Sequence, residues 1–318
     1  MRIGILIAAS MAVAAVATAA VFRHDLNMAT AQIEGRSESI QTRFGKLEFV
    51  VAGAGTPLLM VHGTGGGFDQ ALLFTDALRP RGFRVIAPSR FGYLGSDYPP
   101  DPSSENQADA FVELLDRLGI ERIVIAGGSA GALPAAAFAL RHPERCAGLI
   151  LLVPASNLSG KDPVEMSPLQ VAAVKRLAGS DFLYWAGLKL ARNRLVGTLL
   201  ATDPALLERA SPAERARAEH ILQAILPISR RKSGMLNDGY RAGSPVTFDY
   251  GKITVPTLII TVEDDRFGTA ATARALATRI PHSQLVIYPT GGHIWLGHDQ
   301  DVAEQIATFV AVNSTVRR

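Results

Sequence analysis

Short apolar runs alternate with helix-like segments along most of this chain. PLLMV (57–61), FRVIAP (83–88) and PTLIITV (256–262) are almost wholly apolar. A strand with one solvent-exposed face would alternate apolar and polar residues, so these runs predict strands buried on both faces, as in a parallel sheet. The helix-like segments between them predict an α/β fold with helices on both faces of that sheet.

Other segments complete the predicted sheet and its helices. The remaining expected strands are 39–44 and 47–53, which form a hairpin, followed by 122–127, 147–155 and 283–289. The expected helices are about 68–80, 104–118, the residues after Ser129, and segments that follow the last two strands. Together these segments predict a mostly parallel eight-stranded sheet.

One region interrupts the alternation. Residues 157–252 contain amphipathic helical stretches such as SPAERARAEHILQAIL (211–226) and no convincing strand. We therefore expect a core formed by residues 37–156 and 253–318, with a helical insertion at 157–252 between its sixth and seventh strands.

The N-terminus begins with an uncharged apolar stretch. Residues 3–22 contain no charged side chain, and a helix of this length is about 30 Å long, enough to cross a bilayer. Residues 1–22 are predicted to be a transmembrane anchor or, because Ala17-Thr18-Ala19 matches a cleavage pattern, a signal segment. A merely buried helix is the third interpretation, and residues 23–36 are expected to be a polar connector. An anchor or a signal predicts a membrane-anchored or exported protein.

Composition excludes several classes of function. The net charge is +3, and no run of Lys and Arg resembles a nucleic-acid footprint. Cys146 is the only cysteine, so the chain can form neither an internal disulfide nor a thiolate metal cluster. We expect no nucleic-acid partner.

Ser129 stands in the pattern G-x-S-x-G, within GGSAGA (127–132). A predicted strand precedes it and a helix-like stretch follows, which is the context of a nucleophile elbow. Gly127 and Gly131 would allow strand and helix to approach closely. The amide of Ala130, at the start of the helix, would then point toward an oxyanion.

A second glycine-rich segment, HGTGGG (62–67), directly follows the strand 57–61. Glycines there let backbone amides approach a developing oxyanion that side chains would otherwise crowd. We expect the amide of Thr64 to be the donor, with Gly65 as second choice. The alternatives are a plain glycine-rich turn and a phosphate loop, but the segment lacks G-K-[ST].

A serine attacks carbonyls well only if a base takes its proton and an acid holds that base in one tautomer. His293 follows the last strand and a Gly-Gly turn, which brings it to the same edge of the sheet as Ser129. His298 is the alternative base. The strand 256–262 ends in the acidic run 263–265, of which only one side chain is expected to reach the imidazole.

HGTGGG, GGSAG, EDDRFG and GGH, in this order and spacing, resemble the motifs of α/β-hydrolase-fold serine hydrolases over about residues 37–313. DDRF and GGHIW are further similar to the meta-cleavage product hydrolases, which cut carbon–carbon bonds in ring-fission products. The resemblance selects Asp265 as the acid, because G-x-x-D ends this strand in the family, although Val262 here replaces the glycine. Asp264 stays the alternative. The resemblance also implies that residues 157–252 form a cap over the site.

The same resemblance implies that Ser129, Asp265 and His293 transfer an acyl group to water, with no metal or organic cofactor. The expected substrate is a small molecule with a carbonyl centre and an apolar body, and a carboxylester is the first choice. Carbon–carbon hydrolysis of a vinylogous diketone is the alternative, and a non-catalytic binding protein is a third possibility. The stretch FLYW (182–185) would either line an apolar acyl pocket or pack the cap onto the core.

Overall fold

The computed structural model describes the chain except residues 1, 157, 159–174, 177, 246 and 315–318. Eight strands form one sheet in the order β1-β2-β4-β3-β5-β6-β7-β8. The β1–β2 and β2–β4 pairs are antiparallel and the other neighbours are parallel, which confirms the mostly parallel eight-stranded sheet. The strands are β1 Glu38–Thr42, β2 Gly45–Gly53, β3 Thr56–Val61, β4 Phe83–Pro88, β5 Ile123–Gly128, β6 Cys146–Leu152, β7 Thr257–Val262 and β8 Ser283–Tyr288.

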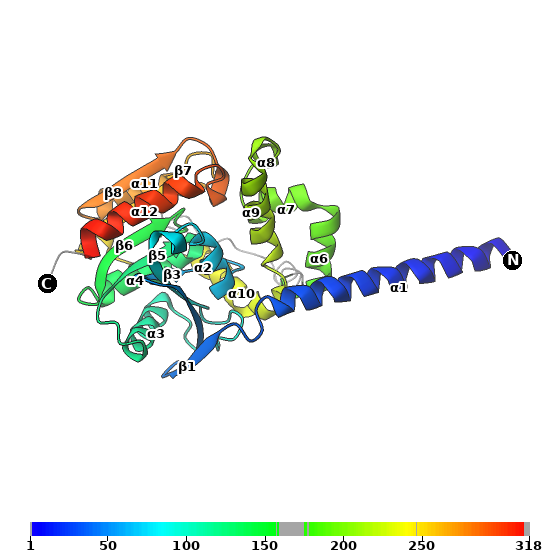
Figure 1. Ribbon diagram of the computed structural model, residues 1–318, viewed down its shortest axis with the longest axis horizontal. Coiled ribbons are helices and arrows are strands. Elements are labelled where there is room, and N and C mark those ends of the chain that lie inside the picture. Colours follow the sequence, from blue (N-terminus) through cyan, green and yellow to red (C-terminus); the bar gives the residue numbers. More distant parts are fainter. Residues whose placement is uncertain (1, 157, 159–174, 177, 246, 315–318) are drawn as a thin grey trace.

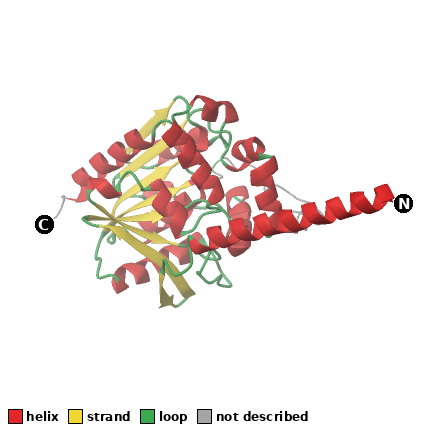
Figure 2. Cartoon of the chain, turned by 45° about the vertical axis from the view of Figure 1, so that its right-hand side comes forward, coloured by secondary structure: helices red, strands yellow, loops and turns green. Residues whose placement is uncertain are grey.

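Helices cover both faces of the sheet, as the apolar runs predict (Figure 2). The core helices are α2 Phe68–Phe74, α3 Ser104–Arg117, α4 Ala132–Arg141, α11 Thr269–Arg279 and α12 Asp299–Ser314. Successive strand residues point to opposite faces. In β3, Leu59 and Val61 join the cluster with α3, α4 and α11, whereas Leu58 and Met60 join the cluster with α2 and α12. Helix α2 ends at Phe74, so it is shorter than the helix expected at 68–80.

The insertion between β6 and β7 is helical in its described part. Its helices are α6 Asp181–Leu190, α7 Arg192–Leu199, α8 Pro204–Arg209, α9 Pro212–Gln223 and α10 Lys232–Gly243. Asp203 and Ser211 cap the N-termini of α8 and α9, and each is followed by a proline at the first helical position. Part of the insertion expected at 157–252, namely residues 157, 159–174, 177 and 246, lies outside the described residues.

Helix α1, Arg2–Ala31, extends away from the body of the molecule (Figure 1). It continues past residue 22, so most of the expected connector 23–36 is helical. Within the described residues, the structure contains no helix long and apolar enough to cross a membrane. The transmembrane prediction for residues 1–22 is therefore not supported.

The C-terminal part of α1 packs against the insertion. The ring of Phe22 lies 5.3 Å from that of Phe182 and 5.5 Å from that of Trp185. Asp25 accepts a hydrogen bond from Trp185 Nε1 at 2.8 Å, while Tyr184 donates to the carbonyl of Leu222 at 2.6 Å. The aromatic residues of 182–185 thus contact α1 and the neighbouring helix of the insertion, a packing that neither interpretation of this stretch included.

Candidate active site

Ser129 follows β5 and has a φ of 52°, a left-handed conformation that costs a non-glycine residue energy. The one-turn 3₁₀ segment Ser129–Gly131 then leads into α4. A Cβ atom at Gly131 would lie 2.5 Å from the carbonyl oxygens of Val61 and His62, and one at Gly127 would overlap the carbonyl of Gly131. The glycines around Ser129 are therefore required because the turn, β3 and α4 approach one another closely.

The HGTGGG loop at the end of β3 lies beside this serine. A Cβ atom at Gly63 would be 3.1 Å from Ser129 Cβ. The buried His62 ring holds the loop, because its Nε2 accepts a hydrogen bond from the Arg90 amide at 2.9 Å and its Nδ1 lies 2.7 Å from the Gly63 carbonyl oxygen. These contacts require hydrogen on Nδ1, and burial keeps the pKa of His62 well below its usual value. His62 is thus a neutral structural residue.

The amides of the loop differ in what they bind. The Gly63 amide donates to Gln70 Oε1 at 2.9 Å, and the Gly65 amide lies against the Tyr93 hydroxyl. Within the described chain, the Thr64 amide donates to no protein acceptor. Thr64 therefore has an amide that is free for a ligand oxygen, whereas the Gly65 amide, the second predicted donor, faces the Tyr93 hydroxyl.

His293 lies after β8, and its Nδ1 is 2.7 Å from Asp265 Oδ2. Both side chains are buried. Asp265 also accepts from the Phe267 amide at 2.9 Å and from the Thr269 hydroxyl. Burial raises the pKa of Asp265, but hydrogen bonds and the charge of the His293 partner outweigh burial and lower it below its usual value. The carboxylate is thus held ionised against the imidazole.

The two alternative residues have other contacts. Asp264 accepts a hydrogen bond from the Gly292 amide at 2.8 Å, so it holds the turn that carries His293 rather than the imidazole itself. The ring of His298 stacks on that of Tyr288 at 4.2 Å. Its Nε2 is 2.9 Å from the Thr290 carbonyl oxygen. The structure brings Asp265 to His293 and leaves Asp264 and His298 outside this contact.

Ser129 and His293 both stand where strands of the parallel sheet end, so they share one edge of it. Among the hydrogen bonds of the described residues, none joins the Ser129 hydroxyl to His293. Catalytic hydrogen bonds of this kind are often long without substrate and tighten in the complex. The described geometry therefore pairs Asp265 with His293, and among the described residues no hydrogen bond joins His293 to the Ser129 hydroxyl.

A buried ionic network that the sequence motifs did not indicate joins the insertion to the HGTGGG loop (62–67). Asp238 on α10 accepts from both terminal nitrogens of Arg90, at 2.7 and 2.6 Å, and from the Tyr93 hydroxyl at 2.5 Å. It also accepts from the Thr64 hydroxyl at 2.9 Å. Burial lowers the pKa of Arg90, but Asp238 more than compensates and raises it. Arg90 and Tyr93 belong to RFGYLGSD (90–97), whereas Asp238 lies in no recognisable motif.

A second buried arginine supports the other end of the loop. Arg231 donates to the Gly66 carbonyl at 2.5 Å, to Asp69 Oδ2 at 2.7 Å and to the Ile225 carbonyl at 3.1 Å. The side chain of Arg231 is fully buried and that of Asp69 is 15% exposed. The loop is therefore fixed at Thr64 and at Gly66 by charged residues that the insertion supplies.

A nucleophile elbow beside a glycine-rich loop, with an acid–imidazole pair at the same sheet edge, defines the class of α/β hydrolases. Residues 56–297 match the model of the alpha/beta hydrolase fold family, so the chain belongs to that family. Among the described residues, no group of three or more His, Cys, Asp or Glu side chains is arranged to hold a metal ion.

Comparison with individual proteins shows which α/β hydrolases this chain resembles. The chain is 29% identical to a 2-hydroxy-6-oxononadienedioate/2-hydroxy-6-oxononatrienedioate hydrolase of Cupriavidus pinatubonensis, over 81% of this chain and 89% of that protein. An alpha/beta hydrolase fold protein from Nakamurella multipartita superposes with a TM-score of 0.70 at 24% identity, over 86% of this chain and 98% of that one. A meta-cleavage product hydrolase from Pseudomonas fluorescens gives a TM-score of 0.62 at 24% identity, over 86% and 97%. The similarity to meta-cleavage product hydrolases is thus confirmed.

Proposed function

We propose that this hydrolase cleaves carboxylesters through an acyl-enzyme formed on Ser129. His293 takes the serine proton as the oxygen attacks the carbonyl carbon, and Asp265 stabilises the imidazolium that results. The proton then passes to the leaving alcohol, and water, activated by the same imidazole, cleaves the acyl-enzyme. The observation that carries the proposal is the 2.7 Å contact of the buried Asp265 with His293, at the sheet edge where Ser129 is strained.

The oxyanion is assigned to the amides of Thr64 and Ala130. Thr64 is fixed from its side chain by Asp238, and its amide donates to no protein acceptor within the described chain. Removal of one such donor typically raises the barrier by about 3 kcal/mol. The contacts that fix the loop are therefore expected to matter for turnover although they never touch the substrate.

The buried charges favour an ester without carboxylates as the substrate. Arg90 and Arg231 are the buried guanidinium groups beside the oxyanion loop, and they are already paired with Asp238 and Asp69. A dianionic substrate needs cations that are free to pair with it, because a buried carboxylate without a partner is costly. An apolar acyl group has no such need.

Carbon–carbon hydrolysis is the second candidate, and the similarity to named relatives favours it. The Cupriavidus pinatubonensis protein, whose name describes a dioate hydrolase, matches this chain over most of both lengths. The same serine, base and acid would serve a ketone carbon. The two candidates differ in the charge of the substrate.

Two measurements test the proposal. A fluorophosphonate probe on the full chain should label Ser129, should not label Ser129→Ala, and should label Ser233→Ala, an exposed serine of α10, as well as the wild type. A folded wild type that takes up no label would leave only a binding role. In a panel of short and long nitrophenyl esters, a lactone and a ring-fission diketone, we expect an ester to have the highest kcat/KM. A preference of about a hundredfold for the diketone would replace the ester proposal with the second candidate.

A further inference from the structure

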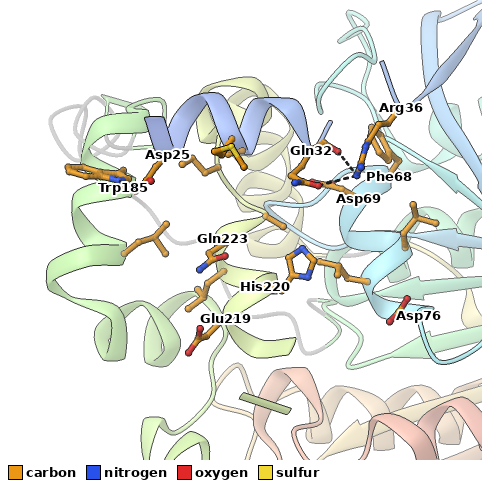
Figure 3. A pocket seen from close by; sticks show the side chains of 18 of the residues that line it. Asp25, Gln32, Arg36, Phe68, Asp69, Asp76, Trp185, Glu219, His220 and Gln223 are labelled. Atoms are coloured by element: carbon orange, nitrogen blue, oxygen red, sulfur yellow. Dashed lines mark hydrogen bonds between the residues drawn. The ribbon is translucent and has the colours of Figure 1, made fainter. Parts of the chain in front are cut away.

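A pocket of about 850 Å³ lies between the C-terminal part of α1, the core helix α2 and helices α6 and α9 of the insertion (Figure 3). This volume falls within the range of small-molecule pockets in proteins. Ser129, Asp265 and His293 are not among the residues that line it. The pocket is therefore a site separate from the catalytic residues.

The pocket has apolar walls that come from all four helices. Its walls include Met28 of α1, Leu72 and Leu73 of α2, Leu188 of α6 and Leu222 of α9. The wall that α1 provides is fixed, because Phe22 packs on α6 and Asp25 binds Trp185. A hydrocarbon chain between these helices would lose contact with water without displacing a polar partner.

Charged side chains surround the pocket, and most of them are already paired. The pairs are Lys189 with Asp25, Arg192 with Glu219 and Arg79 with Asp76. Arg36 differs, because its guanidinium donates to Gln32 and, among the described residues, lies within ion-pair distance of no carboxylate. Figure 3 marks the hydrogen bonds of Arg36 to Gln32 with dashed lines. The rim of the pocket thus has a cation that can receive an anion.

We propose that this pocket binds a single-chain anionic amphiphile, with its hydrocarbon between α1, α2, α6 and α9 and its carboxylate on Arg36. A fatty carboxylate fits this pocket, because its hydrocarbon chain needs apolar walls and its carboxylate needs a cation such as the Arg36 guanidinium. This binding goes beyond the proposed hydrolysis, because it requires neither Ser129 nor a cleavable bond.

Two contacts join the pocket to the oxyanion loop. Asp69 lines the pocket and also binds Arg231, which donates to the Gly66 carbonyl. Ala224 lines the pocket as well, and a Cβ atom at Gly65 would lie 3.4 Å from the side chain of Ile225, the next residue. An occupant of the pocket would therefore touch residues that hold the loop, so ligand binding and turnover are expected to be coupled.

Calorimetric titration of the full-length Ser129→Ala variant with dodecanoate, below its micellar concentration, tests the site. We expect saturable binding of one ligand per chain. Arg36→Gln should weaken dodecanoate binding about fivefold and leave dodecanol unchanged, because only the carboxylate loses a partner. Arg209→Gln, at an exposed arginine of α8, is the matched control and should bind dodecanoate as strongly as the parent.

A second variant fills the pocket. Gln223 is an exposed residue that lines the pocket, so Gln223→Trp should reduce the affinity for both ligands more than about tenfold. Ala213→Trp, at an exposed position of the same helix outside the pocket, should change neither. Thermal melting of each variant identifies any that is unfolded. Absence of saturable binding by the parent, or unchanged binding by folded Gln223→Trp, would overturn the proposal. Neither result depends on hydrolysis.

Discussion

Replacement of Asp238 by alanine should destabilise the protein more than any surface charge change. The side chains of Asp238 and Arg90 are 5% and 7% exposed, so the substitution leaves a guanidinium buried without its carboxylate. Loss of one partner from a buried ion pair costs about 3–5 kcal/mol of unfolding free energy. The Tyr93 and Thr64 hydroxyls lose an acceptor as well. At about 2 °C per kcal/mol for a chain of this size, the melting temperature should fall by about 6–10 °C.

Urea unfolding with matched variants measures this cost. Asp116→Ala breaks the Asp116–Arg145 pair, in which the aspartate is 60% exposed, and should cost less than about 1 kcal/mol. Arg90→Met combined with Asp238→Leu should recover much of the loss, because it removes both charges and because Arg90 Nε has no hydrogen-bond partner among the described residues. If Asp238→Ala unfolds like Asp116→Ala, or if the double variant loses as much stability as Asp238→Ala and Arg90→Met together, the two side chains do not form a coupled buried pair.

The same substitution should also slow catalysis. Asp238 accepts from the Thr64 hydroxyl, and the Thr64 amide is the proposed oxyanion donor. Loss of this contact should lower kcat about ten- to hundredfold in the fraction that remains folded, with a smaller change in KM, because a misplaced donor affects the transition state most. Steady-state kinetics well below the melting temperature, with Asp116→Ala as control, separates this effect from unfolding. An unchanged kcat would show that Asp238 is purely structural.

Three further predictions follow from other contacts. Asp265→Asn should reduce turnover about 10³–10⁴-fold because His293 loses its orienting carboxylate. Asp264→Asn should reduce turnover by less than about tenfold, since an asparagine oxygen can still accept the hydrogen bond from the turn amide, and esterase kinetics with the reverse ranking would contradict this. The pKa of Asp265 is lowered in the folded protein, so the stability that its ionised form contributes relative to Asp265→Asn should be lost as the pH falls below about 5. Urea titrations at acid pH can measure this loss, and a difference that does not shrink with falling pH would argue against it. Deletion of residues 1–19 should leave the melting temperature almost unchanged. Phe22→Ala should lower the unfolding free energy by about 1–2 kcal/mol in urea, because Phe22 packs on the insertion, and equal effects of the two changes would contradict this packing.

Local patterns in the sequence were enough to predict the sheet and the position of the serine. The runs 57–61, 83–88 and 256–262 form strands because their side chains suit burial on both faces. Gly127 and Gly131 marked a close approach of backbone segments, and the structure has one at each position. Such features depend on residues that are adjacent in the chain, so a sequence pattern can predict them.

The N-terminal helix shows how a polar composition misled the prediction. Residues 23–36 were expected to be a connector because they are polar, yet α1 continues to Ala31. The chain contains no glycine or proline between Gly4 and Gly35, so nothing in its backbone ends the helix earlier. The polar side chains serve the packing, since Asp25 binds Trp185 on the insertion.

Contacts between distant segments explain what the motifs missed. Asp238 lies 145 residues from Tyr93 and 174 from Thr64, and no local pattern relates it to either. A buried carboxylate on an amphipathic helix is indistinguishable in sequence from a solvent-exposed one, because only the fold decides whether the carboxylate is removed from water. The sequence motifs indicated Ser129, His293 and Asp265, whereas the insertion supplies the buried charges that fix the HGTGGG loop. The HGTGGG loop therefore depends on residues that its own sequence does not specify, and substitutions in the insertion are where stability and turnover should change together.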